Sequence, residues 1–173
     1  MSADAYPRAL RWLHWLLAPM VAAQFALGWI AEHASDRKLA LGSLQAHLQL
    51  GLLVLVLMLA RVAIRLAQAA PHAPGGLAGC VHALLYALLF ALPASGYVGW
   101  VWMQQPLELW GWLSLPPLFQ PPVDDETWRA RAWYAHLVCA WLLAALVLGH
   151  ASAALWHQWV LRDARIARRM RLP

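Results

Sequence analysis

The sequence has few charged residues: Asp, Glu, Lys and Arg make up only 12% of its 173 residues, against about 25% in an average soluble protein. In their place are four long apolar stretches, covering residues 12–31, 44–66, 77–102 and 132–161. Each is long enough to cross about 30 Å of hydrocarbon, which takes about 20 helical residues. The sequence therefore predicts an all-α integral membrane protein, a four-helix bundle in which residues 1–173 form a single domain.

Cysteine is also scarce. The two cysteines, Cys80 and Cys139, fall near opposite ends of the predicted third and fourth helices, so we expect no disulfide between them. The sequence contains no Cys-x-x-Cys-His segment. Covalent attachment of a c-type haem is therefore excluded by this signature.

The positive charges that are present indicate an orientation in the membrane. Most of the 13 Lys and Arg residues flank the two termini and the middle loop: Arg8, Arg11, Arg61, Arg65, Arg162, Arg165, Arg168, Arg169 and Arg171. The positive-inside rule then predicts that both termini are cytoplasmic, with the basic tail resting on anionic lipid headgroups. Nucleic-acid binding is not expected, because these charges flank membrane spans.

Four histidines lie at the ends of the apolar stretches. His136 and His150 are 14 residues apart on one predicted helix, which is about 40° short of four full turns and about 21 Å of rise. Topology places His14 near the inner membrane face with His150, and His47 near the outer face with His136. Ionisable groups inside a membrane span usually have a function, and the matched depths predict two pairs.

Each pair is suited to hold one haem iron between two imidazoles, because bundle cores commonly build cofactor sites from facing helices. Two axial histidines leave no open position on the iron, which favours electron transfer over oxygen binding. Three further residues lie on the histidine faces. Gly28 and Gly51 would admit a porphyrin edge, or else allow close helix packing. Arg61 would pair with a haem propionate, or else snorkel to the membrane surface.

Several segments resemble the bacterial inner-membrane di-haem cytochrome b-561 family. They are the run Arg11-Trp12-Leu13-His14-Trp15 with Phe25, Gly28 and Trp29; helix two from His47 through Gly51 to Arg61 and Arg65; His82, Tyr86, Pro93 and Gly96; and the tail from Arg162 to Met170. The resemblance implies two non-covalent haem b groups held by the four histidines, and electron exchange with ubiquinone. One branch of the family oxidises superoxide on the outer side, and other branches serve as electron carriers for partner redox proteins.

Quinone chemistry needs protons as well as electrons, and two further histidines are candidates to supply them. His157 lies seven residues beyond His150 on the same face, and His82 lies at inner depth on the third helix. The alternative for His157 is an ordinary interfacial histidine. On the outer side, four basic residues would either steer an anionic donor or be ordinary loop charges: Arg37, Lys38, Arg129 and Arg131. The segment 107–115 has the composition of an interfacial segment.

Three functions remain open at this stage. The first is a superoxide:ubiquinone oxidoreductase, and the second is a cytochrome b subunit that passes electrons between quinol and a periplasmic redox partner. The third is a haem-free carrier of protons or metal, although the predicted spans hold no acidic residues of the kind a divalent-cation path uses.

Overall fold

A computed structural model describes residues 6–68, 75–103, 107–111, 113–121, 126–162 and 169–170 of the chain. The described residues form four helices: α1 (Arg8–His33), α2 (Arg37–Ala67), α3 (Gly76–Trp102) and α4 (Thr127–Trp159). All four are long and apolar enough to cross a membrane. The all-α four-helix bundle predicted from the sequence is therefore confirmed. The helices begin before the predicted spans, and α4 ends at Trp159, two residues earlier than predicted. The largest difference is in α2, which begins seven residues earlier because the Asp36 carboxylate caps it by accepting from the Lys38 backbone N–H.

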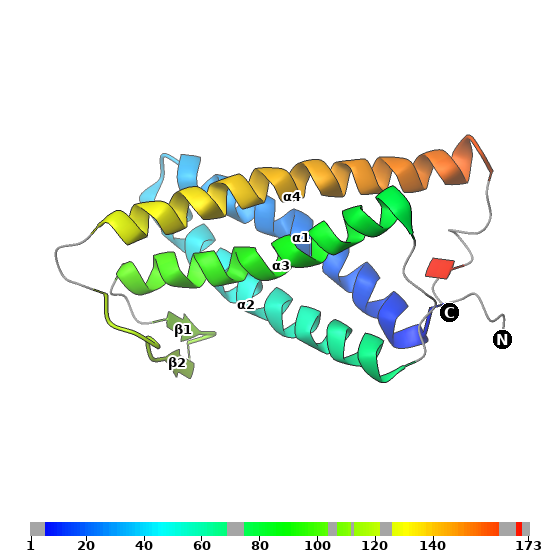
Figure 1. Ribbon diagram of the computed structural model, residues 1–173. Helices are drawn as coiled ribbons and strands as arrows, with labels where there is room; N and C mark the ends of the chain where they lie inside the picture. The colour runs from blue at the N-terminus through cyan, green and yellow to red at the C-terminus, as the bar shows by residue number, and fades with distance from the viewer. Residues whose placement is uncertain are drawn as a thin grey trace.

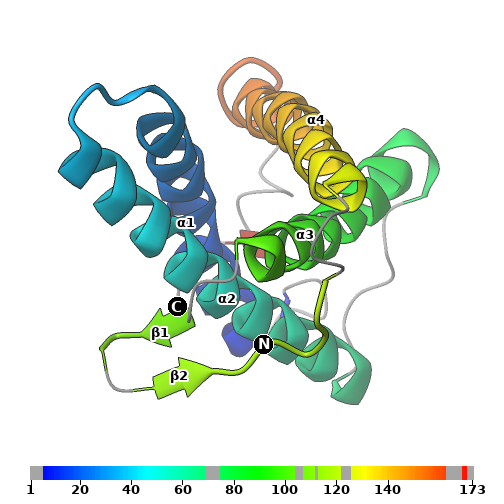
Figure 2. The same cartoon turned by 90° about the vertical axis from the view of Figure 1, so that its left-hand side faces the viewer.

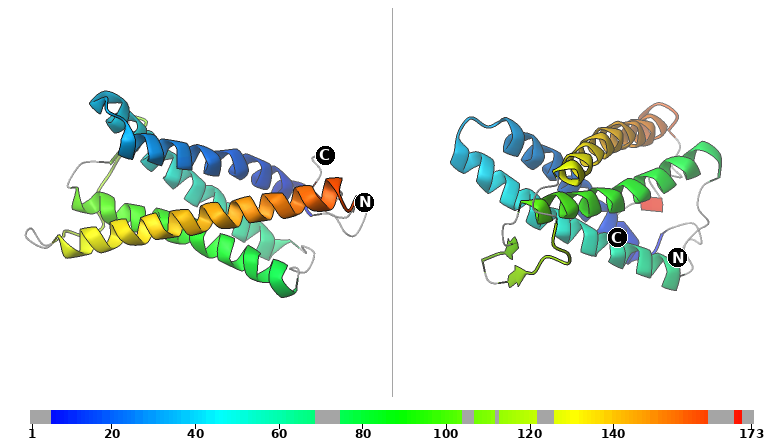
Figure 3. Two further views of the ribbon diagram at one scale, coloured as in Figure 1. Left: turned by 90° about the horizontal axis from the view of Figure 1, so that it is seen from above. Right: turned by 60° about the vertical axis from the view of Figure 1, so that its left-hand side comes forward.

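The bundle consists of two helical hairpins. Helix α1 packs along α2, and α3 packs along α4, whereas the packing of α2 on α3 is much less extensive. In the end-on view of Figure 2, α1 lies beside α2 and α4 lies beside α3, while α2 passes next to α3; Figure 3 shows the helices from two other sides. Three residues, 34–36, connect α1 to α2. A connection that short requires the two helices to be antiparallel neighbours.

Both chain termini lie at one end of the bundle, which we call the terminal end (Figure 1). The backbone N–H of Tyr6 donates to the Arg169 carbonyl at 3.4 Å, and the Trp15 indole N–H donates to the Met170 carbonyl at 2.8 Å. An even number of spans brings the termini to the same side of a membrane. Which side that is remains a prediction from the positive charges.

The opposite end, which we call the distal end, carries a small β hairpin formed by β1 (Leu107–Leu109) and β2 (Leu113–Leu115). It was not predicted: the sequence indicated only an interfacial segment here. Leu109 is buried against Trp100 and Val101, and the side-chain amides of Gln45 and Gln49 both donate to the Glu108 carbonyl. These tertiary contacts, rather than local strand propensity, hold the hairpin in place.

The surface of the bundle is largely apolar. Leu66, Trp141 and Leu148 are 81%, 61% and 68% exposed, and apolar side chains this exposed along helices suit a lipid environment rather than water. The buried core is correspondingly small. One cluster of Leu17, Val54 and Met58 joins the first hairpin to side chains of α3.

Candidate functional site

The four histidines singled out in the sequence meet in two pairs, and each pair joins one hairpin to the other. His14 of α1 faces His150 of α4, with ring centroids 6.3 Å apart. His47 of α2 faces His136 of α4, with ring centroids 6.0 Å apart. We call them the terminal pair and the distal pair. The two partners on α4 are separated by about 21 Å of helix.

The separation of the rings suits a metal ion held between two imidazoles. A metal–nitrogen bond of about 2.0 Å, with about 1.2 Å from nitrogen to ring centroid, places the centroids of two trans imidazoles about 6.4 Å apart. Both pairs lie within a few tenths of an ångström of that value. Among the described residues, no group of three or more His, Cys, Asp or Glu is arranged to hold a metal ion, so neither pair is part of a larger all-protein metal site.

Hydrogen bonds fix the orientation of both rings of the distal pair. Nδ1 of His47 lies 3.1 Å from the Gln24 carbonyl, and Nδ1 of His136 lies 3.0 Å from the Leu92 carbonyl. A carbonyl oxygen only accepts, so each Nδ1 carries the proton. Each Nε2 is therefore left with a free lone pair, which is the tautomer a metal-ligating histidine needs.

Two glycines provide the space for these rings. A Cβ at Gly28 of α1 would lie 3.2 Å from Cε1 of His47, and a Cβ at Gly96 of α3 would lie 3.2 Å from Cε1 of His136. Each glycine is one turn beyond the residue whose carbonyl accepts from that histidine. Because a helical side chain leans back over the preceding turn, the missing Cβ leaves that carbonyl accessible to the imidazole.

Gly51 has a different neighbour. A Cβ there would lie 2.9 Å from Nε2 of Gln24, whose side-chain amide also donates to the His47 carbonyl at 3.1 Å. Gly28 and Gly51 therefore both pack against side chains at the distal pair. That they also admit a porphyrin edge remains a prediction.

The terminal pair has a third histidine beside it. His82 of α3 lies with its ring centroid 5.3 Å from that of His150. No described carbonyl accepts a hydrogen bond from His14 or His150, in contrast to the distal pair. Three imidazoles, from α1, α3 and α4, therefore lie close together at the terminal end. This position of His82 agrees with the depth predicted for it.

Arg61 links three helices at this same end. Its Nε donates to the Tyr86 hydroxyl of α3 at 3.0 Å, and its Nη1 donates to the Leu10 carbonyl of α1 at 2.6 Å. The side chain is half-buried, so it does not simply snorkel to the surface. These contacts hold a positive charge beside the terminal pair, where an anionic group would be stabilised.

His157 lies further along α4 than His150. It lies two turns beyond His150 on α4, about 10 Å further along the helix, and it is half-buried in the last turn. Its position at the terminal end agrees with the sequence prediction. Its role in quinone chemistry stays a prediction.

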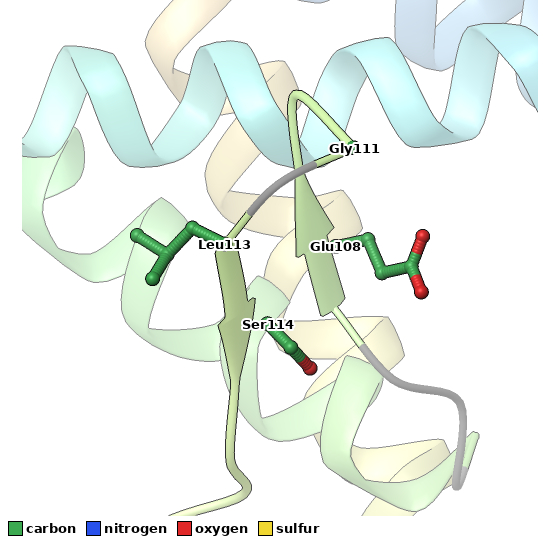
Figure 4. A pocket seen from close by; sticks show the side chains of 4 residues that line it. All are labelled: Glu108, Gly111, Leu113 and Ser114. Carbon is green, nitrogen blue, oxygen red and sulfur yellow. The ribbon is translucent and has the colours of Figure 1, made fainter.

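Two of the basic residues at the distal end, Arg129 and Arg131, have partners nearby. Arg129 forms an ion pair with Glu126, and the Arg131 guanidinium lies 5.0 Å from the centre of the Trp128 ring. The Arg129 charge is therefore partly cancelled. The β hairpin at this end also carries a small surface pocket lined by Glu108, Gly111, Leu113 and Ser114. Figure 4 shows it on the hairpin itself rather than between the helices, with the Glu108 carboxylate pointing outward.

Sequence reasoning missed the residues that support the distal pair. Gln24 and Leu92 act through backbone carbonyls, which no residue type reveals, and Ser95 lies beside His136 only because α3 packs on α4. The one signal in the sequence was the glycine one turn after each carbonyl. That signal is too common in membrane helices to be specific.

Comparisons with known proteins cover nearly the whole chain. A family model described as prokaryotic cytochrome b561 matches residues 5–171. The chain is 30% identical over 176 residues to a protein named cytochrome b562 from Cereibacter sphaeroides, an alignment that covers 96% of this chain and 95% of that protein. It is 28% identical over 165 residues to cytochrome b561 homolog 2 of Escherichia coli K12, covering 90% and 85% of the two chains.

Proposed function

The chain belongs to the prokaryotic cytochrome b561 family, and on that premise we propose that it holds two non-covalent haem b groups, one between the histidines of each pair. It is a multi-pass membrane b-type cytochrome of the bacterial inner membrane that transfers electrons. His14 and His150 would ligate the terminal haem iron, and His47 and His136 the distal one. The observation that carries the assignment is the near-equal ring separation in two pairs at two depths.

A haem b group supplies a one-electron ferrous–ferric couple. Two histidine side chains of this protein would hold each haem iron, and the group held in this way would supply electron transfer rather than oxygen binding. The chain's own residues contribute fixed ligand orientation at the distal pair. At the terminal pair, Arg61 contributes a positive charge to hold a propionate.

We propose that the terminal end is cytoplasmic, as the positive-inside rule predicts. Arg8, Arg11, Arg61 and Arg65 all lie at this end of their helices. The distal pair would then lie near the periplasmic surface. Electrons would cross the membrane between the two depths.

On the cytoplasmic side we propose ubiquinone as the electron acceptor. Its reduction to ubiquinol takes two electrons and two protons, so a proton-donating side chain near the terminal pair is needed. His82, beside His150, and His157, two turns further along α4, are the candidate proton donors. His82 is the better supported of the two, because its ring lies 5.3 Å from that of His150.

On the periplasmic side we propose superoxide as the donor. Two superoxide anions would each lose one electron and leave as O2, and one ubiquinone would take up both electrons with two protons from the cytoplasmic side. Arg37, Lys38 and Arg131 provide positive charge at the distal end, which would attract an anion. The alternative donor or acceptor is a periplasmic redox protein, for which the β hairpin is the available docking surface.

Haem content is the first test. Pyridine haemochrome analysis of the purified protein should give two b-type haems per chain. His47→Ala and His136→Ala should each remove one haem, while His33→Ala, at an exposed position at the end of α1, should remove none. A wild-type protein with one haem would overturn the two-pair assignment. A protein without haem would leave the haem-free carrier as the remaining function.

The donor is tested on the same preparation. Superoxide should reduce the haems rapidly and ubiquinone should reoxidise them, and the reduction should slow with added salt, because steering between charges is screened. Slow reduction by superoxide, together with a redox protein that co-purifies from native membranes, would favour the electron-transfer subunit instead.

A further inference from the structure

Ser95 of α3 contacts one of the two distal histidines, and among the residues that the structure describes it has no counterpart at the other. Its hydroxyl oxygen lies 3.1 Å from Nδ1 of His136. The same oxygen lies 2.9 Å from the Ala91 carbonyl and 3.0 Å from the Leu92 carbonyl. An inference about its role rests on the proposed function, since it concerns a haem held by His136.

The direction of each hydrogen bond follows from the two carbonyls. Leu92 O only accepts, so the proton it receives at 3.0 Å must be that on Nδ1 of His136. The single Ser95 proton is directed to the backbone of its own helix, where the nearer acceptor is Ala91 O. A lone pair of the Ser95 oxygen is then free to accept a second branch of the His136 Nδ1–H bond.

The described residues provide no such second acceptor for His47. Its Nδ1–H donates to the Gln24 carbonyl at 3.1 Å, and the Gln24 side chain turns instead to the His47 backbone carbonyl. Within the described part of the chain, no hydroxyl contacts the His47 ring. The two distal ligands therefore differ in how strongly their Nδ1 protons are bound.

We propose that Ser95 is a positioning residue that lowers the reduction potential of the distal haem through His136. Hydrogen bonds accepted from Nδ1–H raise the electron density on Nε2 and make the imidazole a more basic ligand. A more basic ligand stabilises ferric over ferrous iron, and second-shell hydrogen bonding is one of the features that set a haem potential. A lower potential at the distal haem favours electron flow from the distal to the terminal end.

Ser95→Ala tests this role in the haem-loaded protein in detergent. An optical redox titration should show one of its two steps moved to higher potential and the other unchanged. We expect the distal reduction equilibrium to shift roughly three- to tenfold, about 30 to 60 mV at 59 mV per decade for one electron. Ser95→Thr keeps the hydroxyl and should restore the wild-type titration. Ser152→Ala, an exposed serine of α4, is the matched control and should leave both steps in place.

Electron paramagnetic resonance of the oxidised protein provides the second readout. The low-spin ferric signal of one haem should change in Ser95→Ala, because the ligand field of His136 has changed, and the other should not. Ser95→Cys, whose sulfur is a weaker acceptor, should shift the same step by less, and it replaces the alanine variant should that variant lose haem.

The outcomes separate this inference from the proposed function. A wild-type protein without two bis-histidine haems would refute the proposed function. A Ser95→Ala protein that retains two haems and titrates as the wild type, or in which both steps move equally, would refute the role of Ser95 and leave the proposed function intact.

Discussion

Gly96 of α3 lies against the imidazole of His136 on α4, so closely that a Cβ at position 96 would lie 3.2 Å from Cε1 of the ring. The same distance separates a Cβ at Gly28 from the ring of His47. Both hairpins therefore have the same arrangement, in which a glycine on one helix leaves space for a histidine ring on the other. Spacing along the chain does not reveal this arrangement, because the number of residues between the glycine and its histidine differs greatly between the two hairpins.

Gly96→Val is expected to remove the distal haem while the terminal one is retained. A branched side chain cannot share the space beside Cε1, and the ring must leave the position set by the Leu92 carbonyl. Gly99→Val is the matched control on the same helix, since no atom lies within 4 Å of a Cβ there. Haemochrome analysis should give one haem per chain for Gly96→Val and two for Gly99→Val; equal haem content in the two variants would contradict the packing role of Gly96.

Gly51→Ala is expected to destabilise the protein by about 1 kcal/mol or less, because the crowded atom is the end of a flexible side chain, which can move aside at the cost of its hydrogen bond to the His47 carbonyl. A Cβ at this position would lie 2.9 Å from Nε2 of Gln24. The double variant Gly51→Ala with Gln24→Ala should recover part of that loss, because the crowding amide is gone. The coupling would be measured as a double-mutant cycle of thermal unfolding, and strictly additive effects would rule out the contact as the cause.

Arg61→Leu is expected to cost about 1–3 kcal/mol of stability, since it removes two hydrogen bonds and leaves their acceptors without the guanidinium. Arg65→Leu, one turn further along the same helix, is the control. If Arg61 also holds a propionate of the terminal haem, its removal should lower the reduction potential of that haem, because the positive charge that offsets the propionate is gone and ferric iron is then favoured over ferrous iron. Redox titration of both variants distinguishes the two roles: a loss of stability with an unchanged potential would indicate a structural role only.

Extraction of haem is expected to separate the two hairpins without unfolding either. Packing within each hairpin is extensive, whereas packing between the hairpins is much smaller. Each histidine pair takes one residue from each hairpin, so a haem bound between the two histidines would stabilise the assembled bundle by mass action. Spin labels at Trp12 of α1 and Trp156 of α4, both exposed, would report the distance between hairpins. The labels would be introduced in a protein whose two native cysteines are replaced by alanine.

Labels at Leu84 of α3 and Leu148 of α4, also exposed, provide the control within one hairpin. Double electron–electron resonance should show a broader distance distribution for the first pair after haem removal and an unchanged one for the second. If neither distribution changes, the helices hold the bundle together without the cofactor.

The amino-acid sequence alone determined the spans and the histidine pairs. Apolar stretches of about 20 residues in a chain with so few charges indicate membrane-spanning helices. The depth of a side chain in the bilayer then follows from its position along its span. His14 could therefore be matched with His150, and His47 with His136, before any packing was known. The helix ends were less certain: α2 begins at Arg37 rather than near Leu44, since polar residues continue a helix beyond the hydrocarbon.

Only the tertiary structure decided what surrounds each pair. Backbone carbonyls carry no residue identity, so the hydrogen bonds from His47 to Gln24 and from His136 to Leu92 have no signature in the sequence. The contact of Ser95 with His136 joins residues 41 positions apart, and it depends on how α3 is rotated against α4. The depth of a residue in a membrane is set by its distance along the chain, so the histidine pairs could be predicted. The rotation of one helix against another is set by the packing of all its side chains together, so the contacts that support the pairs could not.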